Sequence, residues 1–122
     1  MNYVLVFIGG GLGSLVRFSM SRFFVSTPQQ FPLATFLSNS LSSFILGLVL
    51  GYFFHKQNTN DSLHLLVATG FCGGFSTFST FSYETFLLLG AGNYKTALAN
   101  IFLNLFVCYL AIVAGFFMSR LL

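Results

Sequence analysis

The chain has 122 residues, enough for one compact unit. Only 6% of its residues are charged and 56% are hydrophobic, whereas about 25% of an ordinary soluble domain is charged. This composition excludes a soluble globular protein, because so few charges cannot cover its surface. The net charge of +3 comes from basic residues scattered singly along the chain, which excludes a nucleic-acid-binding patch. We therefore expect an integral membrane protein.

Four apolar segments are long enough to cross a bilayer as helices, which takes about 20 residues each. We expect a single all-α membrane domain over residues 1–122, with spans at about 3–24, 33–54, 63–89 and 96–118. Short polar connectors join the spans, and no soluble domain fits between them. The work of the protein should therefore be done within the membrane, and we expect no enzyme and no catalytic residues.

The first span carries Arg17 inside its apolar sequence. Two interpretations stay open: the side chain extends to the lipid headgroups, or it lies near a vestibule. The same span begins a pattern of glycines at four-residue spacing, which lets helix backbones approach closely in lipid. The pairs are Gly9 with Gly13, Gly47 with Gly51, and Gly70 with Gly74.

Polar side chains form one stripe on the second span and another on the fourth. The stripes consist of Thr35, Asn39 and Ser42, and of Thr96, Asn100, Asn104 and Cys108, each at spacings that place its members on one helix face. Polar groups inside a membrane are costly and usually face a bundle interior or a water-filled path. Hydrogen bonding that holds the helices together is the simpler interpretation. Two aligned stripes with asparagines favour a polar pathway.

The third span contains the stretch "GFCGGFSTFSTFS", residues 70–82. Each glycine of the pair Gly73–Gly74 costs about 1 kcal/mol against alanine in a helix interior and permits backbone angles that break a helix. Irregular backbone at membrane depth persists only where it is buried in protein or lines a cavity. Many transport proteins build ion sites at broken helices. We therefore expect the third span to be broken near its middle, at an ion site.

The chemistry around this break favours an anion, though weakly. The available groups are the Asn39 amide, the hydroxyls of Ser76, Thr77, Ser79 and Thr80, and phenyl rings whose edges are electropositive. Glu84 is the only acid inside a span, so a ring of carboxylates for cations is missing. Arg17 adds positive charge.

Three motifs together resemble the Fluc family of fluoride channels, also called CrcB-like proteins. They are "GGGLGSLVRF" at 9–18, "TFLSNSLSSFILG" at 35–47 and "GFCGGFSTFSTFSYE" at 70–84, and the third is highly specific. The resemblance extends over essentially the whole chain, and the fourth span is its least diagnostic part.

The resemblance implies an antiparallel, dual-topology homodimer with two pores that pass fluoride passively. Asn39 matches the pore asparagine, and Phe78 and Phe81 match phenylalanines whose ring edges face fluoride. Ser79 and Thr80 match hydroxyls of the same ridge, and Asn104 joins the pore from the fourth span, where the family more often has hydroxyl residues.

The resemblance further implies a structural Na⁺ at the dimer centre, held by the backbone carbonyls of Gly73 and Ser76, with no organic cofactor. It also implies a role in fluoride resistance. The expected partners are a second copy of the chain, fluoride and membrane lipid. The expected location is the cell membrane of a prokaryote.

Two other classes of protein remain to be considered. A small proton-coupled multidrug exporter is also short and four-spanning, but it needs a carboxylate in the first span, which has none. A non-conducting membrane subunit is the other alternative. Basic residues are nearly balanced between the two sides, with Lys56 and Arg120 opposite Arg22 and Lys95. The charge count thus leaves open whether the chain inserts in both orientations or in one that weaker signals set.

Overall fold

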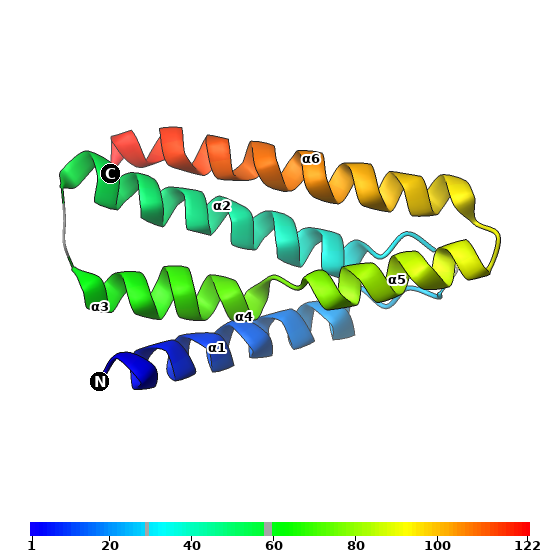
Figure 1. The fold of residues 1–122 in the computed structure, drawn as a ribbon, viewed down its shortest axis with the longest axis horizontal. Helices are drawn as coiled ribbons and strands as arrows, with labels where there is room; N and C mark the ends of the chain where they lie inside the picture. The colour runs from blue at the N-terminus through cyan, green and yellow to red at the C-terminus, as the bar shows by residue number, and fades with distance from the viewer. Residues whose placement is uncertain (29, 58–59) are drawn as a thin grey trace.

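The computed structural model describes residues 1–28, 30–57 and 60–122, and all regular structure in these ranges is helical. Four rods lie side by side (Figure 1). The rods are α1 (Asn2–Phe23), α2 (Leu33–Lys56), a segmented third rod, and α6 (Tyr94–Met118) with the short 3₁₀ turn η2 (Ser119–Leu121). The third rod consists of α3 (Asp61–Leu63), the π-helical segment η1 (His64–Cys72), α4 (Gly73–Phe75) and α5 (Phe78–Gly90).

Each of the four rods is long and apolar enough to cross a membrane. The expectation of four spans is therefore confirmed, and the chain is a multi-pass membrane protein. The rods start and end within three residues of the ranges expected from the sequence, at Asn2–Phe23, Leu33–Lys56, Asp61–Gly90 and Tyr94–Leu121.

The spans pack in an order that gives the two halves of the third rod different neighbours. The α1 helix packs against η1 and α4, and α2 packs along α6. The α5 segment, which begins after the interruption between Phe75 and Phe78, packs against α6. Both termini lie at the same end of the bundle (Figure 1). The break thus lies where the third rod passes from α1 to α6.

Glycines set the distance between the paired helices, as their four-residue spacing predicts. A Cβ atom added at Gly13 would collide with the backbone oxygen of Phe71 in η1. One added at Gly47 would collide with the backbone oxygen of Ile112 in α6. At both contacts one helix lies directly on the main chain of the other, with no room for a side chain between them.

The break in the third rod lies at Ser76 and Thr77, later than the glycine pair suggests. Ser76 (φ −76°, ψ 156°) and Thr77 (φ −152°, ψ 120°) are extended, whereas Gly73 (φ −64°, ψ −36°) is helical. A Cβ at Gly74 would collide with the backbone oxygen of Gly10. The expectation of a break near the middle of the third span is confirmed. The glycines themselves belong to the helical turn before the break, where Gly74 allows the close contact with α1.

Candidate functional site

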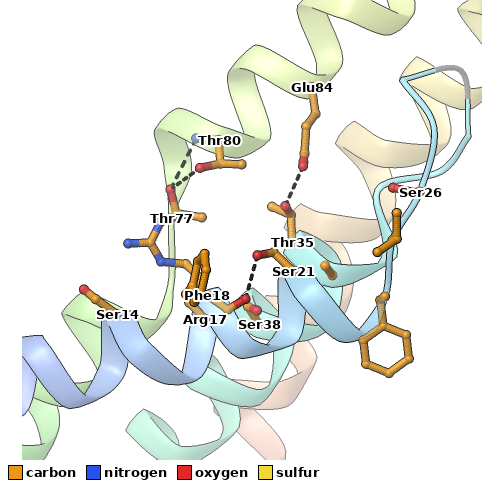
Figure 2. Close-up of a pocket in the computed structure, with 13 residues that line it drawn as sticks. Ser14, Arg17, Phe18, Ser21, Ser26, Thr35, Ser38, Thr77, Thr80 and Glu84 are labelled. Atoms are coloured by element: carbon orange, nitrogen blue, oxygen red, sulfur yellow. Dashed lines mark hydrogen bonds between the residues drawn. The ribbon is translucent and has the colours of Figure 1, made fainter.

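Side chains cap both helix ends at the break. The Thr80 N–H, at the start of α5, donates to Thr77 Oγ1 at 3.2 Å, which is the usual role of a threonine N-cap. At the end of α4, the Gly74 carbonyl accepts from Arg17 Nε at 3.1 Å and from Ser14 Oγ at 3.5 Å. Arg17 is half-buried and points towards the break (Figure 2).

Asn39 pairs with the backbone of the extended segment. The Thr77 N–H donates to Asn39 Oδ1 at 2.8 Å, and Asn39 Nδ2 donates to the Thr77 carbonyl at 3.3 Å. A buried peptide group needs hydrogen-bond partners, and here an amide side chain of α2 supplies them. Asn39 thus replaces the Gly73 carbonyl as the partner of the Thr77 N–H, and it adds a donor to the Thr77 carbonyl.

Asn39 is also the first member of a row of hydrogen-bonded side chains that crosses three rods. Asn39 Nδ2 donates to Asn104 Oδ1 at 3.2 Å, and Asn104 Nδ2 donates to Asn100 Oδ1 at 2.8 Å. Asn100 Nδ2 donates to Thr85 Oγ1 at 2.9 Å, and the Thr85 hydroxyl donates to the Phe81 carbonyl at 2.8 Å. The asparagines of the two polar stripes thus meet inside the bundle.

A pocket of about 250 Å³ lies beside this row. We call it the aromatic pocket; its walls include Asn39, Ser76, Thr77, Phe78, Phe81 and Asn104. The rings of Phe78 and Phe81 lie 5.5 Å apart between centroids and are tilted by 48°. Phe81 is buried at 8% exposure, whereas Phe78 is 75% exposed in the single chain. The wall of the pocket therefore includes a buried ring and, beside it, a ring at the molecular surface.

A larger pocket of about 420 Å³ also adjoins the break (Figure 2). We call it the hydroxyl pocket; its walls include Arg17, Thr35, Ser38, Thr77, Thr80 and Glu84. Glu84 Oε1 accepts a hydrogen bond from the Thr35 hydroxyl at 2.8 Å. The buried Ser38 hydroxyl has no hydrogen-bond partner among the described residues. Thr77 lines both pockets, so the extended segment separates them.

The structure divides the expected pore residues between these pockets. Asn39, Phe78, Phe81 and Asn104 line the aromatic pocket. Thr80 lines the hydroxyl pocket with Arg17. The exposed side chain of Ser79 is on neither wall, and its hydroxyl lies 3.3 Å from that of Thr77.

The backbone carbonyls expected to hold a metal ion have lost their helical partners. The N–H of Thr77 would bond the Gly73 carbonyl in a continuous helix, but it bonds Asn39. The N–H of Thr80 would bond the Ser76 carbonyl, but it bonds Thr77 Oγ1. Carbonyl oxygens released at a helix break are suitable ligands for a hard cation such as Na⁺, so the donor chemistry fits this ion.

Sequence reasoning missed three contacts of the site. It did not pair Thr35 with Glu84, although an acid inside a span needs a partner and Thr35 lies one turn before Asn39. It placed Asn100 and Asn104 on one helix face, but not the bond between them or the one from Asn100 to Thr85. The spacing of four residues between Asn100 and Asn104 could have indicated the bond between their side chains.

Comparison with known proteins identifies similar chains. A family model described as "CrcB-like protein, Camphor Resistance (CrcB)" matches residues 4–116. A Pyrococcus furiosus protein named "Fluoride-specific ion channel FluC" is 46% identical over 116 residues, which cover 95% of this chain and 94% of that protein. Proteins of the same name from Azobacteroides pseudotrichonymphae and Escherichia coli O139:H28 are 40% and 44% identical, over 95% and 82% of this chain and 94% and 79% of their own lengths.

Proposed function

The chain belongs to the CrcB-like family, and we propose that it is a fluoride-selective channel through which fluoride leaves the cytoplasm passively. The observation that carries this proposal is the aromatic pocket, where Asn39 and Asn104 lie beside the rings of Phe78 and Phe81. The Asn39 amide, which Asn104 orients, supplies N–H donors, and phenyl edges are electropositive. Together they suit a small anion that has shed its water, and export would protect the cell against fluoride.

The two pockets suggest a route for the ion. Arg17 places a positive charge in the hydroxyl pocket, which would draw an anion in from one side. The hydroxyls of Thr77 and Thr80 could then replace part of its hydration shell. Since Thr77 lines both pockets, we place the passage to the aromatic pocket at the extended segment.

A second copy in the opposite orientation would complete the aromatic pocket. Phe78 and Ser79 are exposed in the single chain, and an isolated chain therefore leaves one wall of the pocket at its surface. In an antiparallel dimer, each copy would cover the exposed wall of the other copy's pocket, and the dimer would therefore have two equivalent pores. The exposed Gly73 and half-buried Ser76 would bring their carbonyls to the same interface, where we propose that they hold Na⁺.

Release of anions from reconstituted vesicles tests the function. Vesicles loaded with potassium fluoride or potassium chloride should release fluoride rapidly and retain chloride, with no proton gradient required. Release of both ions at similar rates, release of neither, or fluoride release that depends on a proton gradient would overturn the proposal.

Phe81→Ile should lower the fluoride rate at least about tenfold, equivalent to about 1.4 kcal/mol of lost stabilisation of the ion in transit. Isoleucine fills much of the space but has no electropositive ring edge. Phe102→Ile makes the same change at a 67% exposed position of α6 and should leave the rate unchanged.

A further inference from the structure

The row of side chains that ends at Thr85 has a fixed direction. The Thr85 hydroxyl donates its hydrogen to the Phe81 carbonyl at 2.8 Å. Its oxygen can therefore only accept from Asn100, which must present Nδ2, at 2.9 Å. A hydroxyl that is committed to a backbone carbonyl thus decides which way the first amide faces.

That orientation passes from one amide to the next. Because Asn100 turns Nδ2 to Thr85, its Oδ1 faces Asn104 and accepts from Nδ2 at 2.8 Å, and the Asn100 backbone carbonyl accepts from the same nitrogen at 3.0 Å. Asn104 then presents Oδ1 to Asn39, which donates to it at 3.2 Å. At the far end the Thr77 N–H, which can only donate, holds Asn39 Oδ1 at 2.8 Å. Both ends of the row therefore require the same orientation of every amide.

Burial makes this orientation costly to reverse. Asn100 is 0% exposed and Asn104 is 4% exposed, so water cannot readily replace a lost partner. A flipped Asn104 would set its Nδ2 against Nδ2 of Asn39 and its Oδ1 against Oδ1 of Asn100. Each buried group left unsatisfied in this way is disfavoured, by an amount that exceeds the gain from an ordinary hydrogen bond.

We propose that Thr85 and Asn100 are positioning residues that hold Asn104 and Asn39 so that Asn39 offers N–H, and not oxygen, to the aromatic pocket. This inference rests on the proposed function, because the orientation matters to transport only if an anion passes. The Asn39 N–H bonds, at 3.2 and 3.3 Å, are long, whereas the bond that its oxygen accepts is 2.8 Å. A passing anion can thus replace one of the long bonds while the short one keeps the amide in place.

Fluoride release by Thr85 variants is the first test. Thr85→Val keeps the shape of the side chain but removes the acceptor for Asn100, and the fluoride rate should fall about tenfold. Thr85→Ser keeps the hydroxyl and should release fluoride at the wild-type rate. Ser82→Ala is the matched control, because Ser82 donates a similar bond to the Phe78 carbonyl at 2.9 Å but has no part in the row.

The second test detects the orientation directly and needs no transport. In protein labelled with ¹⁵N-asparagine, the Asn39 side-chain signal is identified by its loss in Asn39→Asp. Thr85→Val should shift this signal although the two residues share no hydrogen bond, whereas Thr85→Ser and Ser82→Ala should leave it in place. An unmoved signal in Thr85→Val overturns the inference, and so does a shifted signal with an unchanged fluoride rate. If the wild type releases no fluoride, the proposed function fails, and the signal still shows whether Thr85 orients Asn39.

Discussion

The Gly74 carbonyl shows how a single group released by a helix break is satisfied from a neighbouring span. Arg17 donates to it from α1 at 3.1 Å. Carbonyls at the C-terminal end of a helix carry partial negative charge, so a guanidinium beside them is favourable. The arginine therefore has two roles in the proposed channel: it caps α4 and it places positive charge in the hydroxyl pocket.

Replacement of Arg17 should destabilise the protein. Arg17→Met keeps much of the aliphatic stem but leaves the Gly74 carbonyl with only the long bond to Ser14, at 3.5 Å. A hydrogen bond from a charged donor contributes about 1.5–3 kcal/mol, so we expect a fall of that size in the free energy of unfolding, measured by denaturant titration in detergent. Arg22→Met removes the same charge from an exposed position and should change the free energy of unfolding by less than about 0.5 kcal/mol. Equal effects of both variants would show that Arg17 acts only through its charge.

Among the elements, the third rod combines features that the sequence predicts with others that it does not. The pair Gly73–Gly74 and the hydroxyls after it predict an interruption in this rod, and the structure has one. Its position at Ser76 and Thr77 depends on Asn39, which is 38 residues away and pairs with Thr77. Helical periodicity gives the face on which Asn39 lies, but not the depth at which α2 meets the third rod. The pairing was therefore beyond sequence reasoning.

The released carbonyls of this rod lead to a prediction about sodium. Replacing Na⁺ with N-methylglucamine should lower the melting temperature of the purified protein, because a bound ion stabilises the folded state by mass action, by about 2.7 kcal/mol at one hundred times its dissociation constant. Ser76→Ala removes the hydroxyl, which donates to the Cys72 carbonyl at 2.9 Å, but keeps the Ser76 carbonyl. The sodium dependence should thus persist in Ser76→Ala. Identical melting curves of the wild type in the two cations would contradict a sodium site.

In the whole molecule, basic residues are spread almost evenly between the two ends of the bundle. Lys56 and Arg120 lie near the end that carries both termini, and Arg22 and Lys95 lie near the other end (Figure 1). Membrane orientation follows an excess of Lys and Arg on the cytoplasmic side. With no clear excess, the proposed antiparallel dimer would draw its two copies from a population inserted both ways.

Reporter fusions at the C-terminus measure this population. Green fluorescent protein reports a cytoplasmic C-terminus and alkaline phosphatase an external one, and we expect both fusions of the wild type to be active. Asp61→Lys adds a positive charge at an exposed residue near the end with the termini, so it should raise fluorescence and lower phosphatase activity. Activity of only one wild-type fusion would exclude dual topology.

The direct glycine contacts have a consequence for how the protein can evolve. Because Gly13 and Gly47 rest on main-chain oxygens of the adjoining helices, backbone geometry alone fixes the separation of the rods. Exposed apolar residues such as Phe102 and Phe106 do not affect that separation. Lineages living in membranes of different thickness or fluidity are therefore free to exchange one bulky apolar residue for another on the outside, and the separation of the rods stays the same.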